Sequence, residues 1–206
     1  MPSSQYDWSK MRHDIHIVGY AFRLRPIEYA DAEFIVEVRT PERSAFLNPI
    51  VRSVEAQQAF LEDYFQRPND YYFVIERKAN QHREGLTGLL AFDDQRKSAE
   101  WGRHILRPDS LAAPESALLV FRLAFDWFHL DEVWGTVLTS NKRMISYTES
   151  CGLARRRAMQ IPVGGVMRDA FEYVLPRAQW PATQSSLDDL ARTAGKLLQA
   201  QEPPAP

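Results

Sequence analysis

Apolar and polar residues alternate with a period of two along several short segments, which indicates β-strands. Tyr20–Arg25 alternates in this way and ends at Pro26, which cannot donate a hydrogen bond to a sheet. Residues 71–75 are aromatic and β-branched, and two further apolar segments, 85–92 and 98–106, follow after short polar links. Three successive strands joined in this manner predict an antiparallel meander.

Apolar positions spaced three to four residues apart predict helices before this meander. Residues 34–38 carry such a stripe after Asp31, which could cap the helix or lie in its first turn, and Pro41 ends it. Ser53 is a good N-cap for a second amphipathic helix over residues 54–65. We therefore expect two helices between the first strand and the meander.

The segment after the meander reads as strand, loop, helix and strand. The loop, residues 107–114, leads into a mostly apolar helix that begins near Glu115, with Pro114 at a favourable first position. Because this helix start follows a strand directly, its backbone N–H groups could meet an anion. Residues 132–138 form the next predicted strand, parallel to the strand that ends at Leu106, because a crossover helix joins them.

The last part of the pattern predicts one more helix and two strands. Asn141 can cap a helix that runs to Cys151, and Gly152 is a natural stop. The strands are expected over residues 153–161 and 169–175.

The pattern predicts an α+β protein with one domain and two terminal segments. We assign residues 1–19 to an N-terminal arm, 20–176 to the domain, and 177–206 to a tail. The tail holds a helix-capable segment, residues 186–199, which is expected to dock weakly or fray, and a disordered Pro-rich end.

Composition narrows the classes of function. The 206 residues are 45% hydrophobic and 25% charged, as in ordinary globular domains, and a net charge of −2 argues against nucleic-acid or membrane partners. The chain has a single cysteine, Cys151, which excludes an internal disulfide framework and is best interpreted as a buried helix residue. One cysteine also offers no cluster of zinc ligands, so no metal site is predicted. No segment approaches the ~20 apolar residues of a membrane span, and the polar N-terminus lacks a signal-peptide core, so a cytoplasmic location is expected.

The order β-α-α-β-β-β-α-β-α-β-β, over Phe22 to Leu175, resembles the GCN5-related N-acetyltransferase (GNAT) fold, and within it the ribosomal-protein alanine and amino-sugar acetyltransferases. The residues that carry the resemblance are Leu24-Arg-Pro-Ile with Asp31-Ala-Glu, Ala99-Glu-Trp-Gly102, Leu123-Ala-Phe125 with Leu130-Asp-Glu-Val133, and Asn141 with Glu149-Ser-Cys-Gly-Leu153.

The resemblance implies a mixed, mostly antiparallel sheet of about seven strands, splayed between strands four and five, with about four flanking helices and the appended C-terminal helix. It also implies acetyl-CoA as co-substrate, with its pantetheine arm in the splay and its pyrophosphate at the start of the helix near Glu115. The residues it assigns to acetyl-CoA are Trp101, Arg103, Ile105, Arg107, Ser110, Leu111, Ala112, Ala113, Glu115, Ser116, Asn141, Arg143 and Ser146.

The loop before this helix departs from the family pattern. Asp109-Ser-Leu111 stands where the family usually carries Gly-x-Gly, and Asp109 adds a negative charge close to the expected phosphates. Pro114 removes one donor. Arg103, Arg107 and Arg122 could compensate, whereas Arg143 could meet phosphate oxygens or be solvated.

Candidate catalytic residues follow from the same resemblance. Glu100 lies where many members place a general base that acts through water, although it could equally be an exposed strand carboxylate or part of a salt bridge. Thr148 takes the place of the tyrosine that often protonates the leaving thiolate, while Tyr147 precedes it and Ser146 is a further candidate. The thiolate could also leave without an enzyme acid, because the pKa of a thiol is about 8.5.

The acceptor pocket could be shaped by Arg25, Asn48, Tyr72 and His104, with core or loop packing as the alternative role. The implied function is acetyl transfer to a small amine, an amino sugar or a protein N-terminus. The alternative is a non-catalytic GNAT-like binding protein that has lost acetyl-CoA. Tyr6, Trp8, Trp180 and the tail helix could bury the surface of a homodimer or of a lid.

Overall fold

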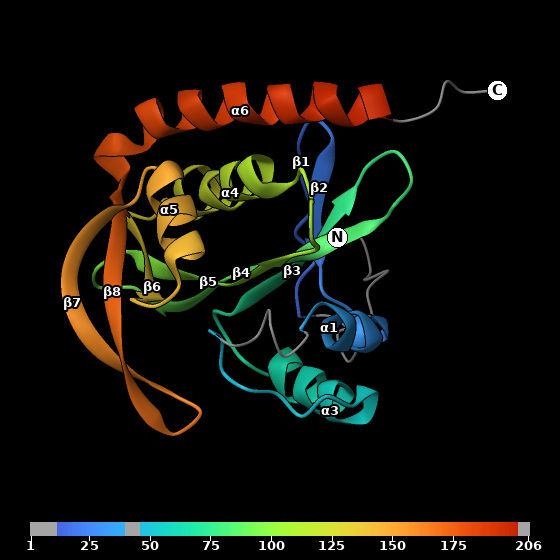
Figure 1. The fold of residues 1–206 in the computed structure, drawn as a ribbon, viewed down its shortest axis with the longest axis vertical. Coiled ribbons are helices and arrows are strands. Elements are labelled where there is room, and N and C mark those ends of the chain that lie inside the picture. The colour runs from blue at the N-terminus through green and yellow to red at the C-terminus, as the bar shows by residue number, and fades with distance from the viewer. Residues whose placement is uncertain (1–11, 40–45, 202–206) are drawn as a thin grey trace, which may run out of the picture.

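The computed structural model of the chain describes residues 12–39 and 46–201. Its centre is an eight-stranded sheet in the order β1-β2-β3-β4-β5-β6-β8-β7 (Figure 1). Neighbouring strands are antiparallel except β5 and β6, which are parallel. The strands are β1 Ile17–Val18, β2 Phe22–Pro26, β3 Tyr71–Arg77, β4 Arg83–Asp93, β5 Ser98–Leu106, β6 Glu132–Leu138, β7 Ala154–Val163 and β8 Val166–Pro176.

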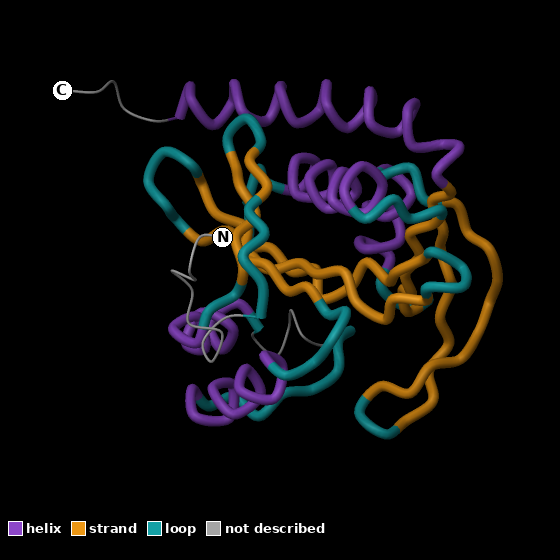
Figure 2. The backbone as a smooth tube through the Cα atoms, turned by 180° about the vertical axis from the view of Figure 1, so that it is seen from behind, coloured by secondary structure: helices purple, strands orange, loops and turns teal. Residues whose placement is uncertain are grey.

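Two layers of helices cover the two faces of this sheet. The helices are α1 Ala32–Val38, α3 Val54–Phe65, α4 Ala113–Arg122, continued by a π-helical turn over Leu123–Trp127, α5 Lys142–Ser150 and α6 Trp180–Gln201. Helices α1 and α3 lie on one face, and α4, α5 and α6 on the other, as both views show (Figures 1 and 2). Each face has its own apolar core, and α4 lies at the centre of the larger one, with residues 117–121 fully buried.

The structure confirms the predicted mixed α+β fold and corrects the number of strands. The strand that the pattern did not predict is β1, a two-residue strand that pairs with β2 inside the segment assigned to the arm. Two residues are too few for alternation to be visible in the sequence.

Two predicted N-caps and one predicted helix stop are confirmed, whereas α4 begins at Ala113, two residues before the predicted start, and Asp31 makes no side-chain capping bond to α1. The Asn141 side chain accepts a hydrogen bond from the backbone N of Met144 at 3.1 Å, which starts α5. Ser53 accepts from Ala56 in the same way at the start of α3. Gly152 ends α5 with a φ of +86°, a conformation that glycine adopts without a steric penalty.

The C-terminal helix docks more firmly than expected, which corrects the prediction of a fraying segment. It has 22 residues and packs along α4, with Leu187, Ala191 and Leu198 buried. Trp180 is only 4% exposed, stacks on Phe125, and does not offer a dimer surface. Tyr6 and Trp8, the other residues considered for such a surface, lie outside the described residues.

Within the described part of the chain, the hydropathy of every helix is too low, or the helix too short, for it to cross a membrane.

Candidate active site

A fork between the parallel strands β5 and β6 sets the position of the candidate site. The two strands pair only over residues 98–100 and 132–134, and then diverge. Gly135 lies at the fork, where a Cβ atom would come within 3.0 Å of the Trp101 carbonyl oxygen. The predicted splay between the fourth and fifth strands is therefore present, and it falls between β5 and β6 because β1 adds one strand to the numbering.

A β-bulge in β5 follows directly after the fork. Gly102 pairs with Gly88 and Ile105 with Leu86, so β5 has one residue more than β4 between these pairs. Arg103, inside the bulge, has a φ of +54°. The extra residue shifts the alternation of the side chains that follow, so His104 lies beside Trp101 on the face covered by α4 and α5, and Arg103 lies over Tyr72 on the other face.

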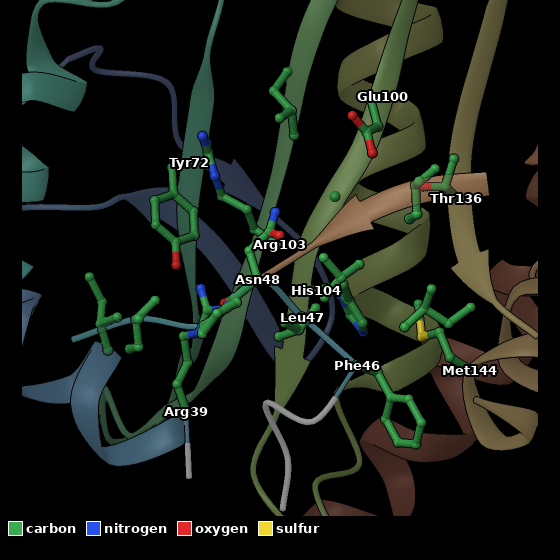
Figure 3. A pocket seen from close by; sticks show the side chains of 18 of the residues that line it. Arg39, Phe46, Leu47, Asn48, Tyr72, Glu100, Arg103, His104, Thr136 and Met144 are labelled. Carbon is green, nitrogen blue, oxygen red and sulfur yellow. The ribbon is translucent and has the colours of Figure 1, made fainter. Parts of the chain in front are cut away.

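A cavity of about 670 Å³ opens at the fork, within the range of ordinary small-molecule sites (Figure 3). Its walls come from β5, β6, the start of α3, the loop 46–51 and the tip of the β7–β8 hairpin. A Cβ atom on Gly164, at that tip, would lie 3.3 Å from the Pro49 side chain, so the hairpin contacts the loop. We call this cavity, between the fork, the loop 46–51 and the hairpin tip, the cleft.

Glu100 is the only carboxylate among the described residues that line the cleft. Its side chain points into the cavity (Figure 3), and no described cation lies within ion-pair distance of it. Burial raises the pKa of Glu100 above its ordinary value, and the charge of Arg103 opposes this shift only in part. A carboxylate with a raised pKa is a stronger base, as proton abstraction from an amine requires.

Arg103 lies on the wall of the cleft formed by β3 and α3, which we call the acceptor side, over the rings of Tyr64 and Tyr72. This wall is on the other face of the sheet from α4, so the predicted contact of Arg103 with acetyl-CoA is not supported. Its guanidinium forms a bidentate ion pair with Asp70, with an Nη2–Oδ2 distance of 2.7 Å. It also lies over the ring of Tyr72, 4.9 Å from the centroid. The pair fixes the charge of Arg103 within the wall.

Arg107 and Ile105 also face away from the expected cofactor path, which corrects both predictions. Arg107 donates to the carbonyl oxygen of Arg83, pairs with Glu37 at 2.6 Å and lies over the ring of Phe34. Ile105 is buried in the core beneath α1 and α3. Arg122 likewise pairs with α6 instead of reaching the loop.

Trp101, His104 and Tyr147 form an aromatic cluster between β5 and the helices α4 and α5. The indole N–H of Trp101 donates to Thr87 at 3.0 Å. His104 stacks on Tyr147 with ring centroids 5.2 Å apart, and burial lowers the pKa of His104 to about 4, so the imidazole is neutral at pH 7. His104 lines the cleft, as predicted for the acceptor pocket.

Neither predicted thiolate acid reaches the cleft. The hydroxyl of Tyr147 donates to the carbonyl oxygen of Ala113 at 2.8 Å, and burial raises its pKa well above the ordinary value. Thr148 is buried, and neither residue is among those that line the cavity. The geometry thus favours departure of the thiolate without an acid from either residue.

The loop before α4 contains a residue in the left-handed region at a position where the resemblance implies glycine. Asp109 has a φ of +58°, in the left-handed region that Asp tolerates better than most residues. Ser110 accepts a hydrogen bond from the backbone N of Ala112 at 3.2 Å, and the N–H of Ser116 bonds to the Ala112 carbonyl oxygen. The N–H groups of Ala113 and Glu115 lie in the first turn of α4.

The side chains of Glu115 and Ser116 point away from an expected phosphate, which corrects their assignment as side-chain ligands. The Glu115 carboxylate accepts hydrogen bonds from the backbone N of Ala21 and of Phe22. Ser116 donates to the Ala113 carbonyl oxygen at 3.0 Å. The Glu115 bonds hold the start of α4 against β2, whereas the Ser116 bond lies within the helix. The backbone of this turn is therefore the part that can meet a ligand.

A second, smaller cavity of about 430 Å³ lies between the start of α4, α5 and α6. Ser110, Leu111 and Ala113 line it together with Leu190 and Leu197 of α6. Three residues assigned to acetyl-CoA therefore share one apolar groove. Tyr147 lines this groove while His104 lines the cleft, so their stacked rings separate the two cavities.

The predicted residues of α5 lie on its open side. Arg143 and Ser146 are exposed, and Arg143 forms no ion pair with any residue in the described ranges. Asn141, the helix cap, lines the cleft beside Met144.

Of the predicted acceptor residues, Asn48 and Tyr72 line the cleft and Arg25 does not. Arg25 is bound on the sheet edge by Asp31 at 2.7 Å and Glu76 at 3.2 Å, so its predicted role in substrate binding is corrected to a structural one. The sequence analysis missed Arg39 and Gln57, which also line the cleft. No local motif marks either residue.

Comparisons with known proteins agree with this architecture. The family model of the GNAT acetyltransferase domain matches residues 22–154. A GCN5-related N-acetyltransferase from Brucella melitensis has a TM-score of 0.76 at 19% identity, covering 89% of each chain. Apo FdhC, a nucleotide-linked sugar GNAT, has a TM-score of 0.68 at 25% identity, covering 84% of this chain and 96% of its own.

A spermidine N-acetyltransferase from Vibrio cholerae, solved with CoA and spermine, has a TM-score of 0.70 at 17% identity, covering 79% of this chain and 99% of its own. None of the curated proteins compared with the chain matched it.

Proposed function

The chain belongs to the GNAT acetyltransferase family, whose members use acetyl-CoA, and we propose that it acetylates a primary amine held in the cleft by direct attack on the thioester. The observation that carries this proposal is the fork between β5 and β6 with Glu100 beside it. A small amine, an amino sugar or a protein N-terminus could supply the nitrogen.

The residues around the fork fit the thioester end of acetyl-CoA. Beyond Trp134, the diverging strands β5 and β6 no longer pair with each other, so backbone groups from both can bind a ligand arm between them. When bound, acetyl-CoA supplies an activated acetyl group. Asn141 and Met144 line the same end of the cleft.

The start of α4 fits the phosphate end of acetyl-CoA less well, but it offers backbone N–H groups that can bind phosphate oxygens. The left-handed turn at Asp109 preserves the loop, and the N–H groups of Ala113 and Glu115 lie in the first turn of the helix. Arg143 on α5 is exposed and carries a free positive charge for phosphate oxygens. The carboxylate of Asp109 opposes the phosphates only weakly, because it is solvent-exposed and screened.

In the proposed reaction the neutral amine attacks the thioester carbonyl, forming a C–N bond as the C–S bond breaks. The proton lost by the nitrogen passes to Glu100, directly or through one water. The thiolate leaves and takes up a proton from solvent, which the pKa of a thiol, about 8.5, permits.

A thiol-release assay tests the proposal. Acetyl-CoA is incubated with the protein and with a set of amines, amino sugars and peptides that have free N-termini. We expect release of CoA thiol that depends on one class of amine and a matching N-acetylated product by mass spectrometry. No amine-dependent release from any class, with no binding of acetyl-CoA, would contradict the proposal and favour a non-catalytic binding protein.

A further inference from the structure

Arg39 carries a positive charge into the cleft and forms no ion pair with any residue that the structure describes. It directly follows the last residue of α1 and its side chain extends into the cavity (Figure 3). One of its terminal nitrogens donates to the carbonyl oxygen of Asn48. Its Nε atom is buried and has no hydrogen-bond partner, and no carboxylate of residues 12–39 or 46–201 lies within ion-pair distance.

The neighbouring arginines of the described chain differ from Arg39, because each of them has a carboxylate partner. Arg103 and Arg107 are also partly buried, and each is paired with a carboxylate, Asp70 or Glu37. Burial lowers the pKa of Arg39 and the charge of Arg103 adds to this effect, but a guanidinium stays protonated in proteins. A buried charge without a partner is costly, and a ligand of opposite charge would remove that cost.

The groups around Arg39 suit an anion. Tyr72 is almost fully buried, and its hydroxyl points toward Arg39 (Figure 3). Gln57 is buried in the same wall, with its amide nitrogen bonded to the carbonyl oxygen of Val51. A planar guanidinium beside a hydroxyl donor matches the oxygens of a carboxylate or a phosphate.

The two walls of the cleft carry different charges. Arg39 lies on the wall formed by α1, β3 and the loop 46–51, whereas Glu100 lies on the opposite wall near the fork (Figure 3). Arg103 contributes a second guanidinium, neutralised by Asp70. A ligand that spans the cleft would therefore meet a cation at one end and a base at the other.

We propose that Arg39 binds a carboxylate or phosphate group of the acceptor, so that the substrate is an amine that also carries an acid group. This inference rests on the proposed acetyl transfer and names the class of amine. The anion binds at Arg39, and the amine then lies toward Glu100 and the fork.

The same arrangement selects against polyamines. A polyamine would bring several ammonium groups to a wall that carries an unpaired guanidinium and offers a single carboxylate among the described lining residues. Like charges in a desolvated site repel, so this cleft discriminates by repulsion as well as by attraction. The acceptor of the structurally similar spermidine enzyme is therefore not expected here.

The test uses pairs of amines with and without the anion, and kcat/KM is expressed per neutral amine, because the carboxylate of alanine also makes its amine more basic than that of alaninamide. Glucosamine 6-phosphate is compared with glucosamine, alanine with alaninamide, and spermidine is included as the polyamine. We expect the anionic member of one pair to have a kcat/KM at least tenfold above its neutral partner. The sugar pair and the amino-acid pair distinguish phosphate from carboxylate. Equal rates within both pairs, or a preference for spermidine, would overturn the assignment.

Substitution of Arg39 locates the effect. Arg39→Gln should lower kcat/KM for the preferred anionic amine about 100-fold, since charge-assisted bonds to a buried group are involved, and should lower it much less for the neutral partner. Arg39→Lys should recover part of the loss. An equal loss for the anionic and neutral amines in Arg39→Gln would show that Arg39 is structural.

Binding measured without acetyl-CoA separates this inference from the proposed function. Calorimetric titration of glucosamine 6-phosphate and glucosamine, and of alanine and alaninamide, needs no catalysis. Selective binding of an anionic member by the wild type, lost in Arg39→Gln, supports the anion site even if acetyl transfer fails. If both members of each pair bind with equal affinity, the anion site is refuted, even if acetyl transfer is observed.

Discussion

Replacing Glu100 with glutamine removes the proposed base while keeping its size. The variant should fold normally, because the Glu100 carboxylate forms no ion pair with a described residue and its burial already disfavours the charged form. We expect a change in the free energy of unfolding within about 0.5 kcal/mol, as for substitutions that break no structural interaction. Loss of a general base typically lowers the rate about 10²–10⁴-fold, or roughly 3–5 kcal/mol of transition-state stabilisation.

The assay is thiol release at saturating acetyl-CoA, together with calorimetry for cofactor affinity. Glu100→Gln should lower kcat about 100-fold or more with little change in the Kd of acetyl-CoA. Glu55→Gln, the same change on the exposed face of α3, is the matched control and should leave both unchanged.

The pH dependence gives a second, independent signature. Because burial raises the pKa of Glu100, the ionised base is present only above that raised pKa, and kcat/KM should fall as the pH drops through it. This acidic limb should disappear in Glu100→Gln. Unchanged turnover in Glu100→Gln, or a lowered rate with the acidic limb intact, would refute the role of Glu100.

Three further predictions concern the loop before α4, the packing of α4 and α6, and acid stability. Asp109→Asn removes the negative charge and keeps a residue that tolerates a positive φ. Calorimetry should therefore show that acetyl-CoA binds about 2–5-fold more tightly to this variant. Equal or weaker binding would mean that the phosphates do not lie near this loop. Gly19→Ala should lower the free energy of unfolding by roughly 1–3 kcal/mol, because its Cβ would overlap the Glu115 carboxylate. Gly195→Ala, inside α6, should raise it by about 0.5–1 kcal/mol, because the new Cβ would lie an ordinary 3.6 Å from the Ala21 side chain. Urea midpoints that shift in the same direction for both variants would contradict this pair of predictions. Burial lowers the pKa of both His13 and His104 to about 4, so the stability that depends on their neutral forms is complete above pH 6.5 and falls as the pH drops to 4, where the unfolded state binds the protons first. His13 accounts for up to about 3 kcal/mol of this fall. His13→Phe should therefore make the urea-midpoint profile less steep between pH 6.5 and 4, with His104 causing the fall that remains, and an unchanged slope would contradict this.

The order of elements could be predicted because it depends on local signals. Period-two and helical patterns, the caps Ser53 and Asn141, and the stop at Gly152 are each written within a few residues of the element they define. The length and docking of α6 could also have been found, because counting alanine as apolar extends the stripe through Ala191 and Ala194 at helical spacing.

The orientation of charged side chains could not be predicted, because their partners are distant in sequence. Arg103 pairs with Asp70, 33 positions away, and Glu115 accepts from Ala21, 94 positions away. The bulge that turns Arg103 toward the acceptor side depends on pairing between strands and not on any residue type in β5. That Arg39 has no carboxylate partner among the described residues likewise becomes clear only from the three-dimensional structure.

Calorimetric titration of acetyl-CoA into the full chain tests the central claim most directly. The fork between β5 and β6, the cleft beside it and the helix start at α4 predict saturable binding of one acetyl-CoA per chain. Absence of binding at millimolar acetyl-CoA would contradict the claim that this chain is an acetyl-CoA-dependent transferase.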